Sequence, residues 1–349
     1  MMKAVVAQGA GDFVFQEVDD PPLPSDGYLL EVEAAGVCAA DRMIWEGNSP
    51  WNITFPFTPG HEIVGRIVDV GAHAERALAV GDRVAVEVMA PCGICDLCRD
   101  NHENLCRDGA HFGSQMPGAF AEKMALPAKS VIHLVPENVS VQDAAGIEML
   151  ANAVHILKRA ALDNADTVVV TGVGAIGATV IQLLRLQHPN AHIVAVVRDE
   201  AKAERALALG AHTVLSTSPQ GTSSVVEAFF EKVSPSGAHR VIELSGSVDA
   251  VDLALELVAP GGRICLYGVY NERYSIDLNL IAEFKELDIV GGHLAPDGAF
   301  AEAISLLSEG KLSLSEIVKE PLPLKEFETA LTAHTGHKYA LSAKGPAHE

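Results

Sequence analysis

Positive charges and aromatic residues are scarce in this chain. Lys and Arg total 25 against 46 Asp and Glu, which gives a formal net charge of -21 at pH 7. Nucleic acid and anionic membrane surfaces would both repel such a chain, so we expect neither as a partner. Aromatic residues make up only 5% of the sequence, whereas alanine and valine are plentiful. That balance is typical of parallel sheets flanked by helices rich in small residues.

Long apolar runs are absent as well. No run approaches the roughly 18 to 20 apolar residues that a membrane span needs. The N-terminal segment MMKAVVAQGAGDFVF lacks the basic stretch, the long apolar stretch and the cleavage site of a secretory signal, so we expect a cytoplasmic protein. With 349 residues, 48% of them hydrophobic, the chain is long enough for two domains with substantial cores.

The six cysteines are unevenly spread, because four of them fall within fifteen residues. In a large protein of a reducing compartment this clustering favours metal ligation over disulfides. Two-residue gaps let three thiolates of one loop converge on an ion, and the longer gap brings the fourth round to close a tetrahedron. Four thiolates leave no position for water, which predicts a structural zinc site. Its ligands would be Cys92, Cys95, Cys98 and Cys106.

Hydrophobic periodicity divides the chain into two regions. Residues 1 to about 90 contain short apolar runs separated by turn residues, at 32–37, 62–70 and 82–88, which predicts antiparallel strands and loops without helices. From residue 166 onward strands alternate with helices, which predicts right-handed crossovers and a doubly wound parallel sheet. The predicted strands are 167–171, 193–197, 213–215, 240–244 and 263–269, and the clearest helices are 175–187, 200–209 and 300–308.

A glycine-rich turn follows the first of these strands, in the segment Thr171-Gly-Val-Gly-Ala-Ile-Gly177. Gly172 permits a tight turn, Gly174 lets the backbone approach a pyrophosphate, and Gly177 allows close packing of the helix on the strand. The N-terminus of the helix offers free N–H groups to the phosphates. The segment predicts a dinucleotide site, for which we select Gly172, Gly174, Ala175, Ile176, Gly177 and also Val269, at the end of a later strand.

The end of the second strand bears on the choice of dinucleotide. Enzymes that use NAD place an acidic residue there, which binds the ribose 2′-OH. Here the strand 193–197 ends in Val197, and Arg198 follows, where a guanidinium could bind a 2′-phosphate. This pattern favours NADP(H) over NAD(H). Asp199 is the alternative, because a shift of register would make it the ribose ligand.

A second set of metal-binding residue types is dispersed along the chain. It consists of Cys38, the pair His61 and Glu62 in a Pro-Gly-His-Glu segment, and the distant Glu148. Thiolate, imidazole and carboxylate together form a mixed set that could leave one zinc position open to water or substrate. Spacing alone does not connect these residues.

The sequence resembles the zinc-containing medium-chain dehydrogenase/reductase family of zinc alcohol dehydrogenase-like enzymes, particularly its threonine and polyol dehydrogenase branches. The resemblance covers essentially the whole chain, and its motifs occur in the family's order. Besides the four-cysteine segment and the glycine-rich turn, they are Gly36-Val-Cys-Ala-Ala-Asp41, Pro59-Gly-His-Glu-Ile-Val-Gly65, Val80-Gly-Asp-Arg-Val84 and Leu209-Gly-Ala211.

The resemblance implies a GroES-like, β-rich catalytic domain and a Rossmann dinucleotide-binding domain, and also a catalytic zinc ion beside the structural one, which makes two per chain. The catalytic domain would consist of residues 1–151 and 295–349, and the Rossmann domain of residues 152–294. It also implies roles for the site residues. Cys38, His61 and Glu148 would hold the catalytic zinc, and Glu62 would bind the metal or stand just behind it. Asp41 matches the residue that accepts a hydrogen bond from the ligand histidine and so fixes its tautomer.

The activity implied is that of a zinc-dependent NAD(P)(H) oxidoreductase. Hydride would be transferred from a small secondary alcohol, polyol or sugar alcohol to nicotinamide, or from reduced nicotinamide to the corresponding ketone. The resemblance also implies a homodimer or homotetramer. Two departures keep alternatives open, since Ala40 and Met43 replace the Ser or Thr and the His that usually relay the alcohol proton. A reductase of an activated imine or C=C bond is the first alternative, and a non-catalytic dinucleotide-binding protein is the second.

Overall fold

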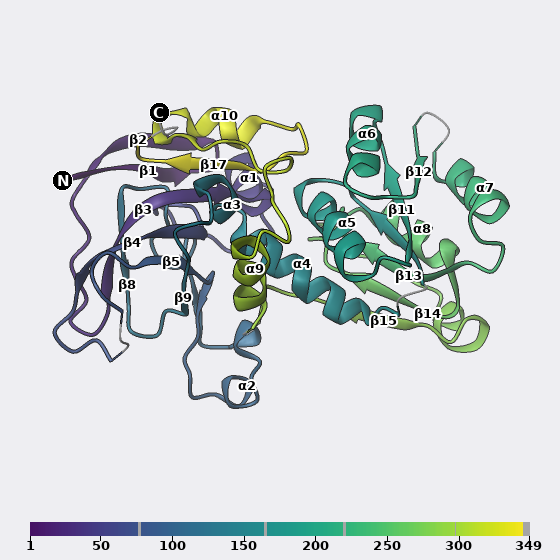
Figure 1. Ribbon diagram of the computed structural model, residues 1–349, viewed down its shortest axis with the longest axis horizontal. Coiled ribbons are helices and arrows are strands. Elements are labelled where there is room, and N and C mark those ends of the chain that lie inside the picture. Colours follow the sequence, from purple (N-terminus) through teal and green to yellow (C-terminus); the bar gives the residue numbers. More distant parts are fainter. Residues whose placement is uncertain (76–77, 164–165, 219–220, 297, 345–349) are drawn as a thin grey trace. The chain divides into compact units, whose positions relative to one another are not determined.

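The computed structural model describes residues 1–75, 78–163, 166–218, 221–296 and 298–344. The chain forms two compact units, which can be followed by colour in Figure 1. The first contains Met1–Ala151 together with Leu294–Glu349, and the second contains Asn152–His293. Helix α4 (Ile147–Ala160) carries the chain from the first unit into the second.

The first unit is built on a seven-stranded sheet in the order β16-β17-β3-β4-β5-β9, with β8 pairing to β3. All of its pairs are antiparallel except β16 with β17, as the apolar runs of the N-terminal region predict. These strands are β3 (Tyr28–Val37), β4 (Glu62–Val70), β5 (Arg83–Val86), β8 (Lys123–Leu126), β9 (Ile132–Leu134), β16 (Leu322–Pro323) and β17 (Tyr339–Ser342).

Smaller elements complete this unit. Two two-stranded sheets are formed by β1 (Met2–Gly9) with β2 (Asp12–Val18) and by β6 (Met89–Ala90) with β7 (Ala110–His111). The core between them and the large sheet contains Tyr28, Leu30 and Phe120, each at most 2% exposed. The helical elements are α1 (Ala39–Glu46), α2 (Asp96–Arg99), η1 (Glu103–Leu105), α3 (Val141–Ala144), α9 (Ala299–Ser308), η3 (Leu324–Glu326) and α10 (Phe327–Thr332).

The helix α1 corrects the prediction that the first 90 residues contain strands and loops only. Cys38 is its N-cap, and the side chain of Asp41 accepts a hydrogen bond from the N–H of that cap. Gly47 ends the helix in the left-handed conformation, with φ of 73°. The helix is short, and its N-terminal capping box is formed by a cysteine and by an aspartate three residues later. The usual Ser or Thr signal at the N-terminus is therefore missing.

The second unit is a six-stranded parallel sheet in the order β12-β11-β10-β13-β14-β15. Numbered along the chain from β10, this order is 3-2-1-4-5-6, so the predicted doubly wound sheet is confirmed. The order in which strands are added reverses between β10 and β13. The strands are β10 (Thr167–Thr171), β11 (His192–Val197), β12 (Thr213–Ser216), β13 (Ala238–Glu243), β14 (Val258–Leu266) and β15 (Asp288–Gly291). The helical elements are α5 (Ala175–Gln187), α6 (Glu200–Ala208), α7 (Thr222–Lys232), α8 (Val248–Leu257) and the π-helical η2 (Leu280–Phe284).

Burial on both faces explains the composition of the central strands. Val168, Val169 and Val170 of β10 are fully buried, as are Ile193 and Val194 of β11. A strand that is covered by helices on both sides has no polar face, which is why these strands are nearly continuous runs of valine and isoleucine. No helix in the described parts of the chain is long and apolar enough to cross a membrane.

The strand predicted at 263–269 begins earlier than expected, at Val258, and also ends earlier. Strand β14 ends at Leu266 and not at Val269, because the N–H groups of Tyr267 and Gly268 both donate to the backbone carbonyl of Glu243. These bonds turn the chain away from the sheet. Val269 consequently lies in the loop beyond the strand and is 41% exposed.

Candidate functional site

A thiol, an imidazole and a carboxylate come together in the first unit. Cys38 follows β3 directly, His61 precedes β4, and Glu62 is the first residue of β4. One ligand atom of each lies within 4.8 Å of the other two. The antiparallel register of β3 and β4 explains this arrangement, because it places Gly36 opposite Glu62. Three of the four residues predicted to surround a catalytic metal are therefore neighbours.

Asp41 supports this group from helix α1. Its Oδ2 accepts a hydrogen bond from the backbone N–H of Cys38 at 2.9 Å, and its Oδ1 lies 3.7 Å from Nδ1 of His61. The Asp41 side chain is fully buried. Burial disfavours the protonated imidazole, but Asp41, Cys38 and Glu62 around it together raise the pKa of His61 well above its ordinary value. The site thus favours positive charge.

Lys338 adds a buried cation that sequence reasoning missed. Its Nζ lies 2.5 Å from Oε1 of Glu62 and donates to the carbonyl of Val37 at 3.3 Å. The C-terminal segment reaches the site because β17 pairs with β3, with Tyr339 opposite Val37. Lys338 and Glu62 are 276 positions apart in the chain. A lone lysine before the short apolar run 339–342 was the only local signal.

The carboxylate of Glu62 occupies space that Gly36 leaves free. A Cβ at Gly36 would lie 2.1 Å from Oε2 of Glu62. This Oε2 is buried and accepts no hydrogen bond within the described chain, and the same holds for Oδ1 of Asp41. Buried acceptors without donors are costly, and a nearby metal cation would compensate them. Thiolate, imidazole and carboxylate are also common zinc ligands, so the residues present fit a zinc ion.

Glu148 stands apart from this three-residue group. It lies in the first turn of α4 and is 9% exposed. Its charge is among those that raise the pKa of Lys338, although burial of the ammonium opposes them and the Glu62 carboxylate contributes more. It also lines a small cavity with Glu87, Met89 and Phe300, all residues of the first unit. The structure therefore places Glu148 near Lys338 but outside the set of ligand atoms that lie within 4.8 Å of one another.

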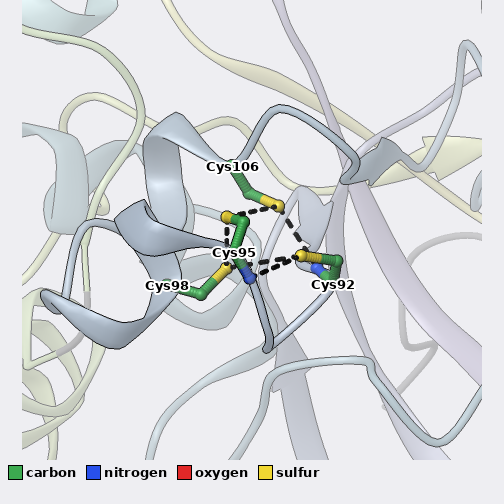
Figure 2. Close-up of side chains that lie close together, drawn as sticks. All are labelled: Cys92, Cys95, Cys98 and Cys106. Atoms are coloured by element: carbon green, nitrogen blue, oxygen red, sulfur yellow. Dashed lines mark hydrogen bonds between the residues drawn. The ribbon is translucent and has the colours of Figure 1, made fainter.

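The four clustered cysteines converge as their spacing predicts (Figure 2). The Sγ atom of Cys98 lies 3.5 Å from that of Cys95 and 3.9 Å from that of Cys92, and the Sγ atoms of Cys95 and Cys106 are 3.9 Å apart. In a regular tetrahedron with Zn–S bonds of about 2.3 Å, the sulfur atoms are about 3.8 Å apart. All four thiols are free of disulfides. The group therefore has the dimensions of a four-thiolate zinc site.

The glycine-rich turn of the second unit has the geometry of a phosphate cradle. Gly172 has φ of +80°, and a Cβ on it would lie 2.5 Å from the backbone nitrogen of Ser245. A Cβ on Gly177 would lie 2.4 Å from the carbonyl oxygen of Gly172, so the helix packs directly on the turn. Gly174 is the N-cap of α5 and has open space where a side chain would project. These three conditions match those of a dinucleotide-binding turn.

The remaining predicted contacts of the cofactor lie on the same edge of the sheet. Ala175 and Ile176 are the first two residues of α5, where N–H groups are free of helical partners. Val269 lies in the loop after β14, and its carbonyl oxygen would be 2.3 Å from a Cβ on Gly246. The carboxyl ends of β10, β13 and β14 thus meet at the point where the strand order reverses.

The end of β11 has a buried valine and an exposed arginine. Val197 is the last residue of the strand and is 3% exposed, and Arg198 beyond it is exposed. Asp199 is the N-cap of α6: its Oδ1 accepts from the N–H of Lys202 at 2.9 Å, and its Oδ2 lies 2.8 Å from Nζ of Lys202. Both oxygens of the alternative ribose ligand are therefore engaged.

A further guanidinium lies close to the glycine-rich turn, and sequence reasoning missed it as well. Nη2 of Arg205 donates to the carbonyl of Val173 at 3.4 Å. Its Nε and Nη1 are buried without a partner in the part of the chain that the structure describes. Arg205 belongs to helix α6, so the contact ties this helix to the turn.

Comparison with known proteins agrees with this geometry. Residues 24–137 match the family model of the alcohol dehydrogenase GroES-like domain, and residues 175–309 match that of zinc-binding dehydrogenases. The erythritol/L-threitol dehydrogenase of Mycolicibacterium smegmatis is 33% identical over 343 residues, covering 95% of this chain and 93% of the relative.

Two solved structures bear on the cofactor. An Escherichia coli CFT073 protein named a short chain alcohol dehydrogenase, complexed with NADH, superposes with a TM-score of 0.89 at 27% identity. A Sinorhizobium meliloti 1021 protein assigned to the zinc-binding dehydrogenases, bound to NADP, gives 0.89 at 29% identity. Each comparison covers 98% of this chain and 99% of the other.

Proposed function

Since this chain belongs to the zinc-containing medium-chain dehydrogenase/reductase family, we propose that its substrate is a small secondary alcohol, polyol or sugar alcohol, oxidised to the ketone with NAD(P). The enzyme is a zinc-dependent alcohol or polyol dehydrogenase of this family. The observation that carries the proposal is the group formed by Cys38, His61 and Glu62, with a buried carboxylate oxygen that lacks a donor.

In this proposal the two units have different functions. The first, with its GroES-like segment, is the catalytic domain, and the second binds the dinucleotide. The glycine-rich turn holds the pyrophosphate through the N-terminus of α5, because free N–H groups and the helix dipole both favour negative charge there. The roles of the individual residues follow from their contacts.

Cys38 and His61 would hold the catalytic zinc together with a carboxylate, for which Glu148 is our first choice and Glu62 the second. Bound there, zinc supplies Lewis-acid stabilisation of negative charge on the substrate oxygen. Asp41 keeps the imidazole of His61 in the orientation that presents its other nitrogen to the metal. Lys338 holds Glu62 beside the ligands and balances its charge.

Cys92, Cys95, Cys98 and Cys106 would hold a second, structural zinc ion, which gives two ions per chain. The distances between the sulfur atoms support this structural site. A closed four-thiolate site contributes folding energy to its own segment and has no vacant position for a substrate. A cytoplasmic location and a homodimeric or homotetrameric assembly stay predictions from the sequence.

NADP(H) is the proposed cofactor, in preference to NAD(H). Val197 provides no carboxylate to repel a 2′-phosphate, and Arg198 is exposed beside it. The pairing of Asp199 with Lys202 supports the same choice, because both carboxylate oxygens already have a partner on α6, which partly neutralises the charge that a ribose hydroxyl would meet.

A second candidate is a reductase of an activated imine or C=C bond. Ala40 and Met43 lie on α1, directly after Cys38, and neither side chain can carry a proton. A reaction that needs no proton relay from an alcohol would tolerate them. Reduction of such substrates without oxidation of any alcohol would establish this second function.

One experiment decides between these functions. The zinc content of the purified protein is measured, and polyols, sugars, secondary alcohols, imines and enones are screened by the absorbance of the reduced cofactor. Two zinc ions and oxidation of an alcohol support the first proposal. One zinc ion, retained by the cysteines, with no turnover of any compound supports a non-catalytic dinucleotide-binding protein.

A further inference from the structure

Glu243 is a fully buried carboxylate at the end of β13, in the second unit. Its Oε1 accepts hydrogen bonds from the backbone N–H of Ser245 at 2.7 Å and from the hydroxyl of Ser245 at 2.5 Å. Its Oε2 accepts from the N–H of Gly246 at 3.3 Å and from the hydroxyl of Tyr270. No cation forms an ion pair with it in the described part of the chain. Neutral donors from two loops therefore stabilise a buried charge, which is costly unless its hydrogen bonds are made.

The backbone of Glu243 joins the same loops. Its carbonyl accepts from the N–H groups of Tyr267 at 2.9 Å and Gly268 at 3.2 Å, and the next N–H, of Leu244, donates to the carbonyl of Thr171 at 3.1 Å. The loops that follow β10, β13 and β14 are thus linked through one residue. Their separation in sequence is large, so these bonds fix an arrangement that no local turn imposes.

Close packing between the backbones makes this arrangement rigid. A Cβ on Gly172 would lie 2.5 Å from the nitrogen of Ser245, and one on Gly268 would lie 2.3 Å from the nitrogen of Gly246. A Cβ on Gly246 would lie 2.3 Å from the carbonyl oxygen of Val269. A displacement of residues 245–246 must therefore move the glycine-rich turn or the loop that carries Val269.

The position of Glu243 in the sheet indicates which half of the dinucleotide these loops face. In a sheet of order 3-2-1-4-5-6 the cofactor lies across the reversal point, with the adenosine ribose at the end of the second strand. The second strand is β11, on one side of β10, whereas β13 and β14 lie on the other. The loops held by Glu243 consequently face the nicotinamide half.

We propose that Glu243 is a positioning residue for the nicotinamide half of the bound dinucleotide. Its carboxylate fixes the turn at Ser245 and Gly246 and the loop that carries Val269 and Tyr270, and so shapes the surface on which this half rests. The inference depends on the proposed dinucleotide-dependent function. Both carboxylate oxygens are needed as acceptors, because the amide of a glutamine offers one oxygen and turns an N–H group toward donors.

The test compares Glu243→Gln with Glu227→Gln, which removes the same charge from an exposed position of α7. Affinities for NADPH and NADH are measured by nicotinamide fluorescence, and those for 5′-AMP and 2′,5′-ADP, which carry the adenosine half alone, by calorimetry. For Glu243→Gln we expect the dinucleotides to bind about tenfold more weakly, because the loops would then adopt the binding-competent arrangement for a smaller fraction of the time. Affinity for the two adenosine nucleotides and zinc content should stay at the wild-type values. In kinetics, KM for the dinucleotide should rise more than kcat falls.

Three outcomes would overturn the proposal. They are wild-type affinity for the dinucleotides in Glu243→Gln, an equal loss of adenosine nucleotides and dinucleotides, and the same loss in the Glu227→Gln control. If Glu243→Gln does not fold, Tyr270→Phe removes one donor and should weaken dinucleotide binding selectively but less; unchanged binding then overturns the proposal. A wild-type protein that binds no dinucleotide would refute the proposed function itself, and the inference with it.

Discussion

The ammonium nitrogen of Lys338 lies 2.5 Å from Oε1 of Glu62, and both side chains are buried in the first unit. The pair exists because β17 adds to β3 beside Cys38. It holds one oxygen of Glu62, while the other has no donor in the described chain and faces the space left by Gly36. Glu62 is therefore constrained at the site by a group from the other end of the chain.

This pair allows the two candidate carboxylate ligands to be distinguished. We expect Glu148→Gln to lose the catalytic zinc, and Glu62→Gln to keep it. Glu62→Gln should instead be destabilised by about 3–5 kcal/mol, because it leaves the Lys338 ammonium buried without its partner. Urea denaturation and metal analysis of both variants check this. The double variant Glu62→Gln with Lys338→Met is the control and should recover much of the stability; loss of zinc in Glu62→Gln and not in Glu148→Gln would reverse the assignment.

Loss of either of the other ligands should abolish catalysis while the fold survives. For Cys38→Ser and for His61→Ala we expect kcat/KM below about a tenth of the wild-type value, because the Lewis acid is worth several kcal/mol. Zinc content should fall to the single ion of the cysteine site. Circular dichroism serves as the control for folding. Higher activity in protein that has been shown to lack the catalytic zinc ion contradicts the assignment.

The cysteine site should give a different phenotype. We expect Cys95→Ser to lose one zinc ion and to melt at a lower temperature, because a closed four-thiolate site stabilises its own segment. Cys265→Ser is the matched control for zinc content, which should stay at the wild-type value, since this buried thiol lies in β14 and outside both groups of metal-binding residues. A Cys95→Ser protein with wild-type zinc content and Tm shows that the site is not structural.

Cofactor preference depends on Arg198. We expect Arg198→Ala to lower kcat/KM for NADP(H) by about an order of magnitude and to leave kcat/KM for NAD(H) nearly unchanged. The reason is that charge-assisted bonds to a 2′-phosphate are worth about 1.5–3 kcal/mol. Lys232→Ala removes an exposed charge from α7 and is the control. The measurement is kcat/KM for both cofactors. A clear preference of the wild type for NAD(H) contradicts the proposal.

Stability of the second unit should depend on the protonation of His155. Burial, together with the charges of Arg159 and Lys158, lowers the pKa of His155 to about 4. In the unfolded chain a histidine titrates near pH 6.5, so protons bind preferentially to the unfolded state between these values. We expect stability to fall as the pH drops from about 6.5 to about 4, and to fall less in His155→Gln. Urea midpoints at pH 7.5 and pH 5 measure the difference; identical shifts in both proteins exclude this role.

Features encoded within a few residues were predictable from the sequence. The cysteine spacing, the glycine-rich turn with its flanking strand and helix, and the alternation of strands and helices from residue 166 each depend on short-range geometry. The structure reproduces them, including α5 at Ala175–Gln187 and β10 at Thr167–Thr171. Family motifs added the connection between Cys38 and His61, which spacing alone did not provide.

Contacts between distant segments were decided by the tertiary structure. Strand pairing placed Lys338 against Glu62, and Glu148 was left outside the group of close ligand atoms. Likewise, nothing local in the sequence marks Glu243 as the residue that joins three loops. A charged side chain is tolerated in the interior only where hydrogen-bond donors or opposite charges meet it, and strand pairing and the loops that follow the strands determine which distant groups do so.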